Sequence, residues 1–331
     1  MITQLRVGLR LQRFELVAVA LAVAVLTVSA LVVRARLDGI GVTPACWASW
    51  FGGPGNGTPG ICTPTGPAGP AQTFLEINES EAGKVMAAMA LLPLAVGLFL
   101  GVGLVAREIE GGTAPTVWAL ARSRSRWLAG RLLAPVTIVA LLLAALAISS
   151  DVLWAGREPW SPALRFGDAG VHGPVIVAKG LAALGLAMLA GAVVGRMLPA
   201  VIVAAALAVV LYLGGEVARG LWLSGEASRH VVVVDPAHGV DVELGFPGGT
   251  FFSGGWQTAD GRLLDDNSAL ALVPAGQEPW AWMYANLTPV QTGVPGTLYP
   301  EWARLETTGF AVIAVGAVAG TFVVVRRRRP L

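Results

Sequence analysis

The stretch VMAAMALLPLAVGLFLGVGLVA at residues 85–106 contains no charged residue, and REIEGGT follows it at once at residues 107–113. A helix needs about 20 apolar residues to cross the hydrocarbon core of a bilayer, because its backbone groups can bond there only within the helix. The stretch therefore predicts a membrane-spanning helix that ends at Ala106, where a charged segment begins.

Other apolar runs of similar length lie on both sides of this one. They are residues 16–33, 132–150, 175–195, 197–215 and 308–325. The chain is 55% hydrophobic and only 13% charged, with a mean hydropathy of +0.67, which is far from the balance of a soluble domain. We expect an all-α integral membrane protein with six transmembrane helices. A cleaved signal peptide is the alternative for residues 16–33, but Arg34 and Arg36 follow this run in place of a small-residue cleavage site.

The charges between these runs indicate an orientation. Arginines are dense in the short segments at residues 1–15, 107–131 and 326–331 and at Arg196, whereas charges are spread thinly over three long segments. The long segments are residues 34–84, 151–174 and 216–306. Because short arginine-rich segments stay in the cytoplasm, we expect both termini there, the long segments outside, and a multi-pass location in the inner membrane of a bacterial cell.

The long segment before the last run should contain mixed structure. HVVVVD at residues 230–235 is a β-branched run typical of a strand, and PGGTFFSGG at residues 247–255 is typical of a turn and loop.

The segment at residues 107–131 has the most specific pattern in the chain. After the charged pair Arg107 and Glu108, a Gly-Gly break permits a sharp turn, and Thr113 can cap a new helix. That helix, near residues 112–127, would lie along the membrane surface and present basic residues to phosphate or to a partner. A solvated cytoplasmic loop is the simpler alternative.

This segment resembles the corresponding loop of ABC-2 type transporter permeases, whose form is roughly Arg-Glu-x-Glu-x-Gly-Thr, a spacer, Ser-Arg and Gly-Lys. The matching residues are Arg107, Glu108, Glu110, Gly112, Thr113, Ser125, Arg126 and Gly130, with Arg131 in place of the lysine. The chain departs from the common form in two ways. It lacks the proline that many members have just before the position of Ser125, and residues 216–306 form an unusually long segment.

The resemblance implies the membrane subunit of an ABC exporter that works by alternating access and pairs with a second permease copy or a paralogue. It implies a coupling helix that docks on a separate ATPase subunit, with no catalytic residue on this chain. The candidate coupling residues are Arg107, Glu108, Glu110, Gly112, Thr113, Arg122, Arg124, Ser125 and Arg126. ATP and Mg²⁺ would bind the partner, and the sequence indeed lacks a Gly-x-x-x-x-Gly-Lys-Ser/Thr motif. Residues 1–15 are similar to the interfacial helix before the first span, although a simple topology signal explains their arginines equally well.

Two further sets of residues suggest local chemistry. The only cysteines, Cys46 and Cys62, fall in one predicted outside segment, where a disulfide is expected and two free thiols are the alternative. One cluster of residues could bind a metal, but its spacing matches no zinc-protease or deaminase pattern, so we expect a solvated strand and turn with no metal site. Its members are His230, Asp235, His238, Asp241 and Glu243.

Charges beside the apolar runs are costly in a bilayer and therefore candidate functional groups. Lys179 and Glu216 are candidates for a substrate pathway, or their side chains extend to the membrane surface. The basic tail from Arg326 to Arg329 would bind anionic lipid, and no nucleic-acid partner is expected.

Two other classes of function fit parts of the sequence. A membrane-embedded enzyme would use residues 216–306, where Asp265 and Asp266 are further candidates. A structural or sensory membrane protein fits the spans but leaves the pattern at residues 107–131 unexplained.

Overall fold

A computed structural model of the protein describes residues 12–42, 70–112, 123–157, 166, 170–227, 231–233 and 250–328. The chain forms two compact units. The first contains Met1–Trp160, Gly170–Leu213 and Leu305–Leu331, and the second contains Ser161–Ala169 and Gly214–Arg304.

Within these described ranges, six helices are long and apolar enough to cross a membrane. They are α2 (Arg13–Ile40), α5 (Gly83–Glu110), α7 (Arg124–Arg157), α8 (Pro174–Val194), α9 (Met197–Ala227) and α13 (Tyr299–Arg327). The short helix α4 (Pro70–Ile77) and the π-helical turn η1 (Asn78–Ala82) lead into α5 without a break. The predicted fold class, six apolar helices with mixed structure before the last, is confirmed.

These helices extend beyond the apolar runs into segments that the sequence pattern assigns to loops. Residues 34–40 continue α2, and both ends of α7 pass the limits of its run at residues 132–150. The added turns carry charges that find partners within the chain. Arg34 pairs with Asp38 one turn away at 2.8 Å, and Arg157 Nε donates to Asn78 Oδ1 at 2.7 Å. A helix can therefore continue past the apolar stretch, where charge alone suggests an end.

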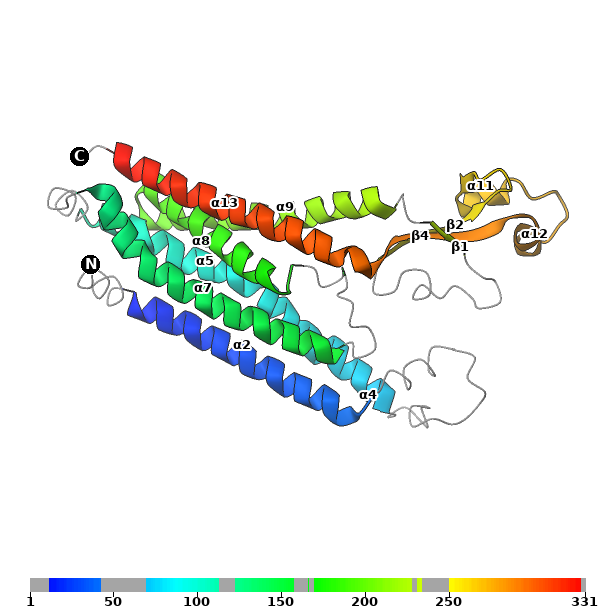
Figure 1. Ribbon diagram of the computed structural model, residues 1–331, viewed down its shortest axis with the longest axis horizontal. Coiled ribbons are helices and arrows are strands. Elements are labelled where there is room, and N and C mark those ends of the chain that lie inside the picture. The colour runs from blue at the N-terminus through cyan, green and yellow to red at the C-terminus, as the bar shows by residue number, and fades with distance from the viewer. Residues whose placement is uncertain are drawn as a thin grey trace. The chain divides into compact units, whose positions relative to one another are not determined.

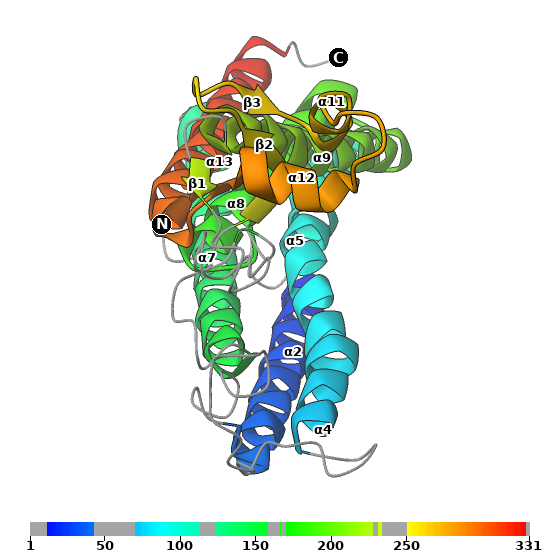
Figure 2. The same ribbon diagram turned by 90° about the vertical axis from the view of Figure 1, so that its right-hand side faces the viewer.

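In the first unit, α2, α5, α7 and α8 lie lengthwise beside one another (Figure 1), and α2 lies beside both α5 and α7 (Figure 2). The closest pair is α5 with α8. A Cβ on Gly97 would lie 2.5 Å from Leu184 N, and one on Gly101 would lie 2.5 Å from the Cβ of Ala187. This Gly-x-x-x-Gly spacing lets two backbones approach closely, which drives helix packing where the solvent is lipid.

Gly97→Ala should destabilise the bundle, because the added Cβ has no room between α5 and α8. We expect the free energy of unfolding to fall by about 1–3 kcal/mol, measured as a lower melting temperature of the detergent-solubilised protein. Gly103→Ala on the same helix is the matched control, since its Cβ would meet no atom closer than 4.0 Å. Equal melting temperatures for the two variants would contradict the close packing.

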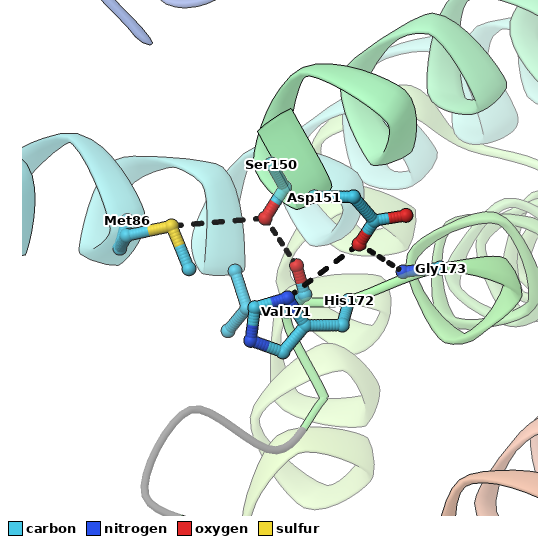
Figure 3. Close-up of polar contacts among 6 residues, drawn as sticks. All are labelled: Met86, Ser150, Asp151, Val171, His172 and Gly173. Atoms are coloured by element: carbon cyan, nitrogen blue, oxygen red, sulfur yellow. Dashed lines mark hydrogen bonds and ion pairs between the residues drawn. The ribbon is translucent and has the colours of Figure 1, made fainter. Parts of the chain in front are cut away.

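Side chains near the end of α7 form hydrogen bonds with the turn that precedes α8. Gly173, at a φ of 53°, donates its N–H to Asp151 Oδ1 at 3.0 Å, and the Ser150 hydroxyl donates to the carbonyl of Val171 (Figure 3). His172 is buried, with Nδ1 at 3.5 Å from the same Asp151 oxygen and its ring edge-on to Trp154 at 4.8 Å between centroids. Side chains from one helix thus fix where the next begins.

The second unit contains an antiparallel sheet in the order β1-β4-β2-β3. Its strands are β1 (Val231–Val233), β2 (Thr250–Gln257), β3 (Leu263–Leu264) and β4 (Thr288–Val294), accompanied by α11 (Asp266–Leu270), α12 (Pro279–Asn286) and the 3₁₀ turn η4 (Gly296–Leu298). The strand expected near residues 230–235 is confirmed over Val231–Val233. The loop expected at residues 247–255 is wrong from Thr250 onwards, because β2 pairs with β4 from Thr250 to Gln257, with a bulge between Phe251 and Ser253.

Candidate functional site: the arginine-rich end

Ends of all six long helices meet through polar contacts in the first unit. The participating side chains, which we call the arginine-rich end, are those of Glu15, Arg107, Glu108, Glu110, Arg124, Arg131 and Arg328. Most of the residues in the resemblance at residues 107–131 belong to it or adjoin it. The sequence pattern is therefore part of a structured region, where four of its charged residues, Arg107, Glu108, Glu110 and Arg131, have partners.

The last turn of α5 reaches two neighbouring helices through consecutive residues. Arg107 pairs with Glu15 of α2 at 2.7 Å on a partly exposed surface. Glu108 pairs with Arg131 of α7, also at 2.7 Å, but here the side chains are only 13% and 12% exposed. The Arg131 guanidinium also lies 5.8 Å from the ring centroid of Trp127, which is buried. Removing one partner of such a sheltered pair leaves the other charge with poor solvation.

Glu110 is bound to a third helix. Its Oε2 accepts the backbone N–H of Met197 at 2.8 Å, and Met197 is the first residue of α9. The first N–H groups of a helix have no partner within it and lie at the positive end of the helix dipole. A carboxylate there both accepts the hydrogen bond and offsets the partial charge, so Glu110 acts as a cap supplied from another helix.

Two arginines of the arginine-rich end bind carbonyl groups at the ends of other helices. Arg124 Nη1 donates to the carbonyl of Arg328 at 2.6 Å and more weakly to that of Arg326 at 3.3 Å, at the end of α13. Arg328 in turn donates to the carbonyl of Ala192 at the end of α8. Its guanidinium covers Gly195, whose φ of 71° turns the chain from α8 into α9. Cations at helix C-termini satisfy carbonyls that the helix leaves unpaired.

The predicted coupling residues occupy different kinds of position. Arg124, Ser125 and Arg126 form the first turn of α7, and Gly112 follows α5 in a turn with a φ of 66°. Arg126 is exposed, and its side chain makes no ion pair or hydrogen bond with the described residues. Thr113 and Arg122 lie outside the described residues, as does most of the expected surface helix at residues 112–127. The role of these residues in coupling stays a prediction.

Sequence reasoning missed several members of the site. Ser123 caps α7, because its hydroxyl accepts the backbone N–H of Arg126 at 3.2 Å. Ser123 is three residues before Arg126, the spacing of an N-cap, which is a usable signal. The partners Glu15 and Arg328 could not be found this way, since they are distant in sequence and charge pairs of this kind follow no local spacing.

The candidates for a substrate pathway lie in different units. Lys179 of α8 is 5% exposed, and its Nζ donates to the carbonyl of Gly170 at 2.8 Å and lies 5.7 Å from the ring centroid of Phe310. Its side chain is thus buried in the first unit and does not extend to the surface. Glu216 forms an ion pair with Arg219 on the next turn of α9, in the second unit. Their part in a pathway remains a prediction.

Other sequence candidates divide into those with structural roles and those outside the described residues. Asp265 caps α11 by accepting the N–H of Ser268 at 2.9 Å. Hydrogen bonds from the Ser268 hydroxyl and from this N–H lower the pKa of the Asp265 carboxyl. Asp266 accepts the indole N–H of Trp256 at 2.9 Å. Cys46 and Cys62 lie outside the described residues. The same holds for the five members of the possible metal-binding cluster, His230, Asp235, His238, Asp241 and Glu243. The described residues contain no group of three or more potential metal ligands.

Six apolar helices whose charged ends are joined by ion pairs and caps define a polytopic membrane protein. The sequence model of the family described as ABC-2 membrane transporter related matches residues 16–219, which cover α5, α7 and α8 and most of α2 and α9. This is more than half of the chain, so the protein belongs to that family. Comparisons with curated proteins and with solved structures gave no significant match.

The pair between Glu108 and Arg131 should contribute directly to stability. We expect Glu108→Ala and Arg131→Ala each to lower the free energy of unfolding, with a coupling energy of about 0.5–3 kcal/mol in a double-mutant cycle measured by thermal unfolding in detergent. The same cycle on Arg34 and Asp38, a more exposed pair within one helix, should give about 0.3–0.5 kcal/mol. A coupling energy near zero for Glu108 and Arg131 would refute the pair.

Proposed function

We propose that the protein is the membrane-spanning subunit of an ABC exporter, that its arginine-rich end faces the cytoplasm, and that exposed residues beside this end bind a separate ATPase. The observation that carries this proposal is the family match over five of the six long helices. It is combined with the position of residues from the 107–131 segment in the arginine-rich end. ATP and Mg²⁺ would bind the partner, while this chain provides the pathway together with a second copy or a paralogue.

The distribution of charge supports a cytoplasmic arginine-rich end. The helix ends there carry Arg13, Arg107, Arg124, Arg126, Arg131, Arg196, Arg326, Arg327 and Arg328. The opposite ends of α2, α5 and α7 carry mixed charges, and Arg36 there pairs with Glu81. Arginine-rich segments near spans are retained in the cytoplasm, and this rule supports a topology with both termini inside and residues 34–84 outside, in a bacterial cell membrane.

The mechanism that this arrangement supports is alternating access driven from the arginine-rich end. Closure of two ATPase subunits on ATP would displace the segment between α5 and α7, and the helices joined to it would move as packed elements. No group on this chain needs to form or break a covalent bond. Export is the direction that the resemblance to ABC-2 type permeases implies.

Arg126→Ala should weaken ATPase binding, because Arg126 is the exposed basic residue of the first turn of α7. We expect about tenfold weaker association, typical of losing an interfacial arginine. The measurement is the vanadate-sensitive ATP hydrolysis that co-purifies with the tagged chain. Arg262→Ala, in the second unit, is the matched control and should retain full activity. If wild-type preparations contain no such activity, the proposal fails.

The orientation can be tested separately with a maleimide that cannot cross membranes. On intact cells we expect Cys46 and Cys62 to react after reduction, because they lie in the predicted outside segment. An Arg327→Cys variant that also carries Cys46→Ser and Cys62→Ser should react only after the membrane is permeabilised. Labelling of this variant on intact cells would reverse the topology.

A further inference from the structure

The two carboxylates of the Glu-x-Glu pattern do not share a face of α5. Residues two apart on a helix are about 200° apart around its axis, so Glu108 and Glu110 extend to opposite sides. Their partners follow this geometry, because Glu108 pairs with Arg131 of α7, whereas Glu110 caps α9 at Met197. A single docked partner could not use both carboxylates from one direction.

Both carboxylates are already engaged within the chain. The Glu108 side chain is only 13% exposed and lies against Arg131, which leaves little of it for another protein to contact. Glu110 is more accessible, but its oxygen satisfies an N–H that α9 itself cannot satisfy. Moving Glu110 onto an external partner would leave this N–H and the helix dipole without compensation.

These contacts lie at the end of α5 and at the start of α7, on both sides of the segment that is expected to dock on the ATPase. The apolar residues Val102 and Ala106 of α5 also pack with Ala187 and Ala190 of α8 and with Ala200 of α9. The end of α5 is therefore joined to α9 twice, by packing and by the cap, and to α7 by the ion pair.

We infer that Glu108 and Glu110 are positioning residues that transmit displacement of the docking segment to α7 and α9, and that they are not contacts with the ATPase. This inference rests on the proposed function. Exposed groups such as Arg126 would bind the ATPase, whereas the two carboxylates would transmit the displacement to α7 and α9. Mutations can therefore separate the two roles.

The test uses full-length chain co-purified with its ATPase and a fluorescent reporter on α9. An environment-sensitive dye is attached through Ile202→Cys, an exposed apolar position on α9, in a chain that also carries Cys46→Ser and Cys62→Ser. The fluorescence change on adding Mg-ATP and vanadate reports movement of α9. Vanadate-sensitive ATP hydrolysis in the same sample reports bound ATPase.

Glu110→Ala should retain the co-purifying ATPase but lose the fluorescence change. Glu110→Gln, which keeps a hydrogen-bond acceptor, should retain both. Hydrogen exchange adds a readout on the chain alone, since the Met197 amide should exchange about five- to tenfold faster in Glu110→Ala, the factor for losing one hydrogen bond.

Each result separates this inference from the proposed function. Loss of the ATPase in Glu110→Ala would make Glu110 a contact residue and overturn the inference while leaving the proposed function intact. An unchanged fluorescence signal in Glu110→Ala, or a Gln variant that behaves like Ala, would also overturn it. Absence of any ATPase from the wild-type sample would instead overturn the proposed function.

Discussion

The close approach of α5 to α8 is the contact on which the arginine-rich end depends. Gly97 and Gly101 leave no side chain between the two backbones, so the helices remain packed up to the end of α5. There, Gly195 turns the chain from α8 directly into α9, which brings the first N–H of α9 within reach of Glu110. A larger residue at Gly97 or Gly101 would separate α5 from α8 and displace the carboxylate from its helix.

This packing also explains why charged residues can be concentrated at one end of an apolar bundle. Each cation or carboxylate of the junction meets either an opposite charge or the unpaired backbone groups of a helix terminus. Burying these groups without partners would cost several kcal/mol. Here the charged side chains and the helix termini supply each other with the hydrogen bonds that water would otherwise make. Arg124 and Arg328 illustrate this best, because both donate to carbonyls at the ends of other helices.

The part of the fold that the lipid bilayer dictates could be predicted from the sequence. Long apolar runs must be helical in a bilayer, so the number and class of spans follow from hydropathy. Helix limits did not follow, because pairs such as Arg34 with Asp38 continue a helix past its apolar stretch. The strand β2 was missed because Gly and Ser in residues 247–255 suggest a turn, while pairing with the distant strand β4 decides the structure.

The site shows the same limit more sharply. The pattern at residues 107–131 identified the region and its family, yet a charged residue in a pattern carries no information about its partner. Exposed charges in such a segment suggest an external contact, but Glu108 has its partner 23 residues away, and Glu110 has a backbone amide of another helix. The Glu-x-Glu spacing, which places the two carboxylates on opposite sides of α5, indicates two different partners. A motif that is useful for recognition by sequence can therefore serve the internal connection of the helices. Under the proposed function, the surface for the ATPase would then consist of the remaining exposed residues.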